Sequence, residues 1–374
     1  MRRREILRLG AIGGAVAALG GLARIRAGVA VAQVNSVPTV DRLVMTNVVD
    51  NIYDVFARGG KLDTITVQRF PLAIGASVKL LAEHGLAYHL ESVRGSERRE
   101  ILLDFSLTEK NLFNNYQVLG VEPATADALI LSHGHADHYG ALPDVARVLQ
   151  GRSKSGLTVY AGGDDTFCHR VVATPSGTYI DQGQLDRPAL EARGLTVVLA
   201  RQPTVVAGHA VTSRQVPRLT DFEKPPAAAR LVAGPMDSAC AASLHFPPGT
   251  LKVEAKPGEL VPDNFQGEIA TAYLVKDRGL VVITSCGHAG VINSVRQVQK
   301  ATGIDKVHAV VGGFHLAPAP DEIVAKTVEA FKTIDPDYII PMHCTGLNTI
   351  FAIQREMPRK LVMPSTGTRV VFGA

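Results

Sequence analysis

Three histidines and one aspartate fall within six consecutive residues, in the order His133-Gly134-His135-Ala136-Asp137-His138. The apolar run 128–131 directly precedes them and predicts a short buried strand. So many imidazole and carboxylate groups are costly to bring together unless a cation lies between them, and both groups are ligands that Zn, Mn and Fe prefer. The pattern predicts a metal site at the end of a strand. A polar turn whose histidines bond within the protein is the alternative.

Apolar runs of strand length alternate with amphipathic stretches over the rest of the chain. This alternation predicts an α/β fold in which helices cover the sheets. Strands are predicted at 43–50, 86–91, 100–104, 128–131, 196–200, 269–275, 280–284, 307–311, 338–341 and 369–372, and helices at 142–149, 291–302 and 322–334. A further helix is expected to begin at the capping box Ser106-Leu107-Thr108-Glu109 and to end at Gly120.

The stretch 218–268 departs from this alternation and is rich in Pro and Ala. We interpret it as a long surface insertion within a domain that spans 33–374. Loops of this length are commonly lids or binding loops, and a passive excursion is the alternative.

The first 32 residues have the features of an export signal. An apolar stretch over 9–23 follows the first arginines, and Ala30-Val31-Ala32 forms a small-x-small cleavage site. The run Arg3-Arg4-Glu5-Ile6-Leu7-Arg8 resembles a twin-arginine signal. We therefore expect a periplasmic or exported protein with no stable membrane insertion after processing. An uncleaved leader that anchors the protein to the membrane is the alternative.

The net charge of +4 comes from this leader, which holds six of the 39 basic residues and one of the 35 acidic ones. The rest of the chain is close to neutral and has no general positive field, so nucleic acid is not an expected partner. A hydrophobic content of 46% is typical of a globular protein with a large core. A small-molecule substrate is expected, and the oligomeric state is left open.

The chain has four cysteines, Cys168, Cys240, Cys286 and Cys344, which are too few for a disulfide framework in 374 residues. Cys286 and Cys344 lie within two residues of a histidine. We expect the cysteines to be neighbours of a site rather than disulfide partners.

The motif HxHxDH after a strand resembles the signature of the metallo-β-lactamase superfamily. That resemblance implies an α/β (α+β) fold, the four-layer αββα sandwich, with one or two metals at one edge of the sheets. Further segments are similar to the branch of 7,8-dihydropterin-6-methyl-4-(β-D-ribofuranosyl)aminobenzene-5'-phosphate synthase-like proteins. These segments are AEHGL (82–86), GLVVITSCGHAG (279–290), VVGGFHL (310–316) and PMHCTG (341–346).

The resemblance implies one or two divalent metal ions, with zinc as the expectation and Mn, Fe or Mg as alternatives. The implied ligands are His133 and His135 for the first metal, Asp137 and His138 for the second, and His288 and His343 to complete the two shells. A hydrogen-bonded histidine without a metal is the alternative for the last two.

Three other residues receive roles, and Asp137 receives a second one. Asp104 matches the family's Asp-Thr-Gly corner, and the resemblance implies that it accepts an N–H from a ligand histidine. Cys286 lies near the place where other members have a bridging aspartate, so no carboxylate is seen to bridge two metals. Asp137 and His315 are the candidate catalytic residues. His315 would bind substrate or donate a proton, and a structural role is the alternative.

Three departures from the branch pattern lie near these residues. The corner Asp-Thr-Gly is Asp104-Phe105-Ser106, and Gly-Glu-Ile-Pro-Arg is Arg214-Gln215-Val216-Pro217-Arg218, which lacks the carboxylate. The glycine before the last histidine is Met342. We expect Met342 to narrow the site.

A divalent metal held by histidines lowers the pKa of its water towards about 7 and polarises a carbonyl or phosphoryl oxygen. We therefore predict a metal-dependent hydrolase in which metal-bound hydroxide attacks an ester, lactone, amide or phosphoester. One alternative is the branch's own chemistry, a pterin-aminobenzene ribose-phosphate synthase-like transferase, whose substrates would be cytoplasmic. The other is a non-catalytic metal-binding protein.

Overall fold

The computed structural model describes residues 33–70, 79–152, 156–235, 238, 240–241, 256–317 and 319–373. The leader predicted at 1–32 lies outside these residues. No helix in the described part of the chain is long and apolar enough to cross a lipid bilayer.

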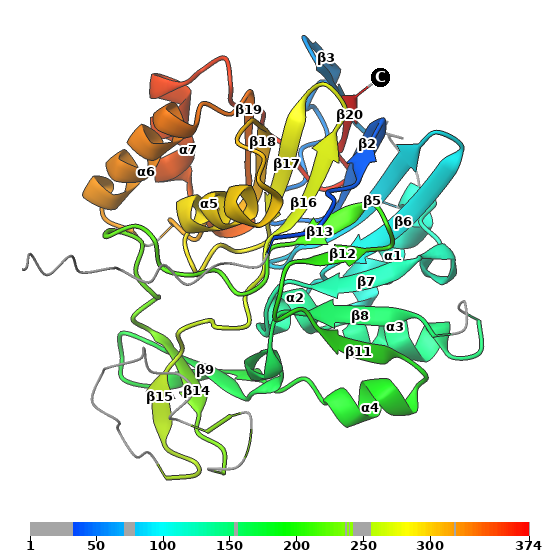
Figure 1. The fold of residues 1–374 in the computed structure, drawn as a ribbon. Coiled ribbons are helices and arrows are strands. Elements are labelled where there is room, and N and C mark those ends of the chain that lie inside the picture. The colour runs from blue at the N-terminus through cyan, green and yellow to red at the C-terminus, as the bar shows by residue number, and fades with distance from the viewer. Residues whose placement is uncertain are drawn as a thin grey trace, which may run out of the picture. The chain divides into compact units, whose positions relative to one another are not determined.

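Two large sheets face each other, and a small third sheet lies beside them (Figure 1). The nine-stranded sheet contains, in spatial order, β11 (Thr196–Leu199), β8 (Thr158–Ala161), β7 (Ala128–Leu131), β6 (Glu97–Leu103), β5 (Ala87–Arg94), β2 (Arg42–Val49), β20 (Arg369–Gly373), β4 (Ile65–Gln68) and β3 (Gly60–Leu62). The seven-stranded sheet contains β12 (Thr204–Val206), β13 (Ala210–Thr212), β16 (Thr271–Val275), β17 (Gly279–Thr284), β18 (Val307–Gly313) and β19 (Tyr338–Met342), with β1 (Thr39–Val40) paired to β16. The small sheet contains β10 (Tyr179–Gly183), β9 (Arg170–Ala173), β14 (Ala229–Val232) and β15 (Leu260–Pro262).

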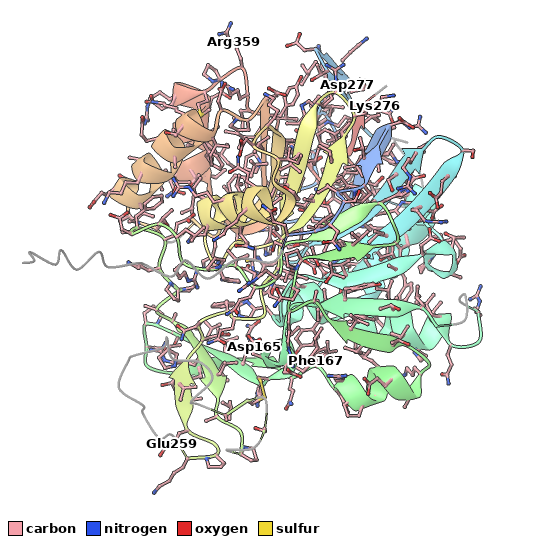
Figure 2. All side chains as sticks on the ribbon, in the orientation of Figure 1. Asp165, Phe167, Glu259, Lys276, Asp277 and Arg359 are labelled. Carbon is pink, nitrogen blue, oxygen red and sulfur yellow. A yellow bond between two sulfur atoms is a disulfide. The ribbon has the colours of Figure 1, made fainter. Side chains whose placement is uncertain are left out.

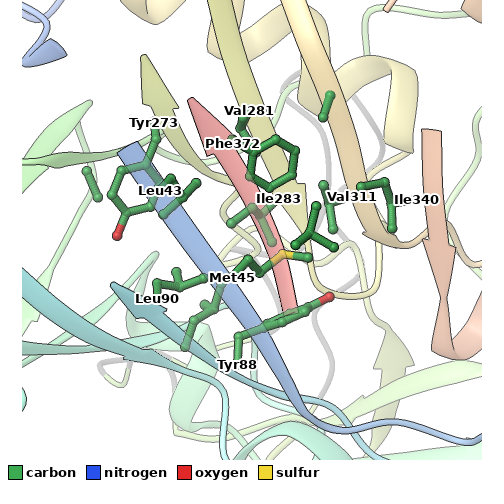
Figure 3. Close-up of a cluster of buried hydrophobic side chains, with 14 of the residues drawn as sticks. Leu43, Met45, Tyr88, Leu90, Tyr273, Val281, Ile283, Val311, Ile340 and Phe372 are labelled. Atoms are coloured by element: carbon green, nitrogen blue, oxygen red, sulfur yellow. The ribbon is translucent and has the colours of Figure 1, made fainter. Parts of the chain in front are cut away.

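Alternating strand residues divide the apolar side chains between an inner core and two outer layers. On β17, Val281 and Ile283 enter the core between the sheets, which Figure 3 shows, whereas Leu280 and Val282 face helices. The helices of one outer layer are α1 (Glu109–Leu119), α3 (Leu142–Leu149) and α4 (Arg187–Ala192), and those of the other are α5 (Val291–Thr302), α6 (Asp321–Ile334) and α7 (Leu347–Glu356). The predicted αββα arrangement is confirmed.

Every predicted strand and helix is present, and α3 and α5 have the predicted bounds. The beginning of α1 differs from the prediction. Its N-cap is Thr108, whose side chain accepts the N–H of Asn111, and Gly120 ends the helix at a φ of 69°. The hydroxyl of Ser106 donates instead to Oε1 of Glu83 at 2.5 Å. A tertiary contact therefore removes Ser106 from the cap position.

The stretch 218–268 is more than a surface insertion in its described part. It supplies β14 and β15, and the side chains of Glu223, Asp263 and Phe265 within it are buried. Cys240, from the same stretch, forms a disulfide with Cys168. The expectation that these two cysteines are not disulfide partners was wrong, because the pairing of β9 with β14 brings segments distant in the chain together.

Parallel neighbours position the predicted site. β6 and β7 run parallel, as do β17, β18 and β19, so the carboxyl ends within each set share an edge of the sheet. The predicted ligands follow these ends. Lys276 and Asp277, labelled in Figure 2, belong to the turn before β17 and therefore lie at the other end of that strand.

Candidate metal centre

The six predicted ligands come from three separate strand ends. His133 follows β7, and the next three ligands lie in the turn and short helix α2 (Ala136–Tyr139). His288 follows β17, and His343 follows β19. All six side chains lie in one buried cluster with Cys286, as the ring and atom distances below show.

His133, His135 and His288 form a triangle of imidazole rings. The ring centroids are 4.9 Å apart for His133 and His135, 4.8 Å for His133 and His288, and 4.7 Å for His135 and His288. Phe265 stacks on His288 at a centroid distance of 4.0 Å. Nε2 of His133 and both ring nitrogens of His288 are buried and have no hydrogen-bond partner among the described residues. Buried polar atoms without partners are costly, so this triangle fits a metal ion.

Asp137, His138 and His343 form a second group beside the triangle. Oδ2 of Asp137 lies 3.2 Å from Nε2 of His343 and 3.7 Å from Nε2 of His138. The two Nε2 atoms are 3.2 Å apart. One carboxylate and two imidazole nitrogens directed at one another can share a proton or hold a cation.

Cys286 lies between the two groups. Its Sγ is within 4.8 Å of ring nitrogens of His133 and His288, and also within 4.8 Å of ring nitrogens of His138 and His343. Thiolate sulfur is a good ligand for zinc, so Cys286 supplies a donor at the place where no bridging carboxylate was seen. Sγ of Cys344 is 3.0 Å from Sγ of Cys286. These two cysteines, unlike the other pair, do lie at the predicted site.

Asp104 orients His138 directly and His133 through Ser132. It is completely buried, and its Oδ2 accepts the Nδ1–H of His138 at 2.8 Å and the hydroxyl of Ser132 at 2.8 Å. Because that hydroxyl donates to Asp104, it accepts from Nδ1 of His133 at 3.0 Å. Both imidazoles therefore carry a hydrogen on Nδ1 and turn Nε2 towards the centre of the cluster.

Asn51 orients the third histidine in the same way. Its Oδ1 lies 3.1 Å from Nδ1 of His343, which leaves Nε2 of that ring to face Asp137. The backbone N–H of His343 donates to Oδ1 of Asp50 at 3.0 Å. Asp50 and Asn51 follow β2, so the end of this strand supports the cluster together with the ends of β6 and β7.

Burial decides the charge of the triangle. It lowers the pKa of His133 and His288 well below the usual value and that of His135 to about 4. These imidazoles are therefore neutral at pH 7, which is the form that binds metals.

The second group has the opposite character. Burial opposes a charge on His138, but the carboxylates of Asp137 and Asp104 outweigh it and raise the pKa of His138 to about 9. Burial also opposes the charge of Asp137, yet His138 and His343 hold the pKa of that carboxyl well below its usual range. In the metal-free protein a proton on His138 thus supplies the positive charge beside Asp137 that a metal ion would supply.

His315 lies at the other side of His288, at a ring centroid distance of 4.1 Å, with its Nδ1 3.7 Å from Sγ of Cys286. Burial would lower its pKa, but Cys344 and Glu268 favour the charged ring, and its pKa is raised.

Met342 does not narrow the site as expected. Its side chain is buried in the core between the sheets, where the hydroxyl of Tyr88 donates to its Sδ at 3.4 Å.

Two residues without a predicted role complete the cluster. Nε2 of His84 is 3.4 Å from Oδ2 of Asp137, and its ring stacks on His343 at 4.8 Å, although 67% of the side chain is exposed. His84 lies in segment 82–86, one of the segments that resemble the synthase-like branch, and this resemblance was the sequence signal that could have identified His84 as a site residue. Arg170 is buried and donates to Oδ2 of Asp263 at 2.7 Å and to the carbonyl of Gly134 at 3.5 Å. No sequence pattern pointed to Arg170.

The chain is similar to several known proteins. A model of the metallo-beta-lactamase superfamily matches residues 94–153. A 7,8-dihydropterin-6-methyl-4-(β-D-ribofuranosyl)-aminobenzene-5'-phosphate synthase of Methanocaldococcus jannaschii is 28% identical over 295 residues, which are 77% of this chain and 90% of that protein. An uncharacterised protein of the same organism is 26% identical over 278 residues, 73% of this chain and 88% of the other. The solved structure of a metal-dependent hydrolase of the beta-lactamase superfamily aligns with a TM-score of 0.60 and 19% identity, covering 87% of this chain and 98% of the other.

Proposed function

Because the chain belongs to the metallo-β-lactamase superfamily, we propose that it is a metal-dependent hydrolase of an ester, lactone, amide or phosphoester. The supporting observation is the triangle of His133, His135 and His288, in which three buried ring nitrogens have no hydrogen-bond partner in the described part of the chain. When bound, a divalent metal, with zinc as the first candidate, lowers the pKa of a water molecule towards about 7 and polarises a substrate oxygen.

Different residues of the chain would bind the metal ions, orient the histidine ligands and donate a proton. The triangle would hold one ion, and the group of Asp137, His138 and His343 a second, with Cys286 between them. Asp104 and Ser132 keep the Nδ1 hydrogens of His138 and His133 in place, so the Nε2 lone pairs of these rings would be free to bind the ions. His315 lies beside His288 at the wall of a cavity, and we assign it the donation of a proton to the leaving group.

Metal analysis combined with a substrate panel tests the proposal. The purified protein should retain metal and hydrolyse at least one member of a panel of phosphodiester, lactone, ester and β-lactam substrates. The double variant His133→Ala/His135→Ala should lose metal and turnover together, whereas His169→Ala, at a histidine paired with Asp181 away from the cluster, should keep both. Turnover by the metal-free double variant would contradict the proposal.

A transferase of the synthase type is the second candidate, and the 28% identity to a named synthase supports it. Chromatographic detection of the compound for which that synthase is named, formed by the metal-loaded protein, would decide for the transferase.

A non-catalytic metal-binding protein is the third candidate. A cobalt-substituted sample whose spectrum shows four protein ligands and no exchangeable position would favour that reading.

We also propose that the protein works in an oxidising compartment after export. The Cys168–Cys240 disulfide supports this, because such bonds persist in oxidising compartments. Cell fractionation should place the wild type outside the cytoplasm, with Gln33 as its first residue. The double variant Arg3→Lys/Arg4→Lys should remain inside the cell, and export of that variant would argue against the twin-arginine route.

A further inference from the structure

A cavity of about 650 Å³ opens beside the histidine cluster. His135, His288 and His315 line one part of it. The remaining wall is largely apolar and comes from β9, from the segment before β14, from the residues after β18 and from α6. Its larger apolar side chains are Val172, Phe222, Phe314, Leu316 and Ile323. A volume of this size is within the range of small-molecule sites.

The beginning of α5 lies at this cavity, because Gly290 is among the lining residues. Free N–H groups at the start of a helix attract anions. Here the protein's own carboxylate already accepts them, since Oε1 of Glu223 accepts the N–H of Ile292 at 2.8 Å and Oε2 accepts that of Asn293 at 2.8 Å. A Cβ at Gly290 would overlap this carboxylate, so the glycine makes the approach feasible.

Glu268 accepts hydrogen bonds from the neighbouring backbone N–H groups in the same manner. Its carboxylate accepts the backbone N–H of His288 at 2.9 Å and that of Ala289. The partly buried Arg218 is also engaged, because it donates to the carbonyls of His288 at 2.7 Å and Asn264 at 3.2 Å. Among the described residues that line the cavity, Lys224 is the only lysine or arginine, and it is exposed.

We infer that the substrate is an uncharged ester, lactone or amide whose apolar acyl group fills this cavity, an inference that rests on the proposed function. A phosphate at the start of α5 would meet the carboxylate of Glu223, and the N–H groups of His288, Ala289, Ile292 and Asn293 already donate to Glu268 or Glu223. In ester hydrolysis a water oxygen bonds to the carbonyl carbon and the C–O bond to the alcohol breaks. One water proton goes to the departing alkoxide, and the other is released when the carboxylic acid ionises, so no oxidant or reductant is needed.

A series of p-nitrophenyl esters from acetate to decanoate tests the inference on the zinc-loaded protein. Because each buried methylene contributes to binding, kcat/KM should rise up to about fourfold per methylene until the cavity is full. p-Nitrophenyl phosphate should be a poorer substrate than any ester of the series. A flat series, or faster turnover of the phosphate than of the octanoate, would overturn the inference and leave the hydrolase proposal standing.

A matched pair of variants locates the acyl group. Ile323→Asn, in the first turn of α6 at the cavity wall, should flatten the dependence of kcat/KM on chain length. Leu347→Asn, in the first turn of α7 and 60% exposed, should keep the wild-type dependence. An unchanged dependence in Ile323→Asn would overturn the placement. Thermal melting checks that both variants are folded.

A binding measurement separates failure of this inference from failure of the proposed function. If the metal-loaded protein hydrolyses no ester, the neutral dye N-phenyl-1-naphthylamine should still bind, and 1-octanol should displace it better than 1-butanol. Equal displacement by both alcohols would overturn the inference.

Inorganic phosphate should raise the melting temperature of Glu223→Ala more than that of the wild type, because the variant frees the N–H groups of Ile292 and Asn293 at the start of α5. An equal rise in both would also count against it.

Discussion

Asp104 controls two imidazoles with one carboxylate oxygen, which accepts from both Ser132 and His138. Its φ is 57°, a conformation that Asn also adopts, so Asp104→Asn changes the acceptor with little cost to the backbone. The amide N–H would donate to Ser132 and face Nδ1 of His138, which reverses the hydrogen positions on His138 and His133. We expect metal affinity to fall about 10- to 100-fold. Competition with a chromophoric chelator measures it.

Asp335→Asn is the matched control for that substitution. Asp335 also has a positive φ, 53°, but it is exposed and follows the end of α6, where it pairs with Lys360. This variant should bind metal as the wild type does. Wild-type affinity in Asp104→Asn would mean that Asp104 does not set the hydrogen positions of the cluster.

The two ligand groups should respond differently to pH. Burial lowers the pKa of His135 to about 4 and the pKa values of His133 and His288 well below the usual value, so all three imidazoles are already unprotonated at about pH 6 to 8. Metal binding to them should release no proton from an imidazole. His138, with a pKa of about 9, must lose its proton first, so affinity at the second group should rise about tenfold per pH unit over this range.

Calorimetric titration in buffers of different ionisation enthalpy counts the protons released with each ion. In a Cys286→Ala variant, where no thiol proton contributes, one proton should leave with the ion that binds more weakly at pH 7, and none with the other. Binding of both ions with the same pH dependence would show that His138 is not the protonated group.

At the scale of elements, the turn between β7 and α2 is held by close packing at Gly134. A Cβ there would overlap the carbonyl oxygen of Thr166 and the guanidinium of Arg170. Gly134→Ala should therefore destabilise the protein by about 1–3 kcal/mol and displace His133 and His135. Denaturant unfolding should show the loss of stability, and metal analysis the loss of metal.

Gly60→Ala provides the comparison, because Gly60 lies in β3 with no heavy atom within 4 Å of a Cβ. That variant should unfold within about 0.5 kcal/mol of the wild type, as surface substitutions usually do, and should retain metal. Equal behaviour of the two alanine variants would show that the turn is not held by this packing.

The beginning of α1 shows why an element's boundary depends on its surroundings. Ser106 and Thr108 are both good N-cap residues, and a local pattern cannot rank them. Glu83 decides, because it accepts the hydroxyl of Ser106 at 2.5 Å and the backbone N–H of Thr108 at 2.9 Å. The ends of α3 and α5 were predicted correctly because their apolar periodicity and, for α5, Gly303 are local signals.

At the scale of the whole molecule, the Cys168–Cys240 disulfide joins residues separated by 72 positions. Closing a loop of this length in the unfolded chain corresponds to about 4 kcal/mol of stability in the chain-entropy model. The double variant Cys168→Ala/Cys240→Ala should therefore have a lower urea midpoint, and hydrogen exchange should increase first in β9 and β14.

The same variant should also lose preference for long acyl chains, because Val172 on β9 and Ala229 on β14 line the cavity. The wild type treated with a reductant is the companion measurement and should follow the variant. An unchanged midpoint and unchanged exchange in β9 and β14 would show that the small sheet is held without the bond.

Much of the architecture and of the ligand set could be predicted because the signals are local. Strand and helix periodicity predicted most of the long strands and helices of the four layers, and the spacing within 133–138 predicted four candidate ligands that do lie together. Helices α2, α4 and α7 were missed, as were the short strands β1, β3, β4, β8 to β10 and β12 to β15. These strands are only two to five residues long, and their pairing partners, rather than their own periodicity, make them strands.

By itself, the sequence determined the strands that end at one edge, the histidines that follow them and the fold family, because residues close in the chain carry these patterns. Only the tertiary structure decided that Cys168 meets Cys240, that His84 reaches Asp137 and that Glu223 covers the start of α5. Each of these contacts joins distant segments. Sheet register and layer packing set such distances, and no spacing along the chain records them.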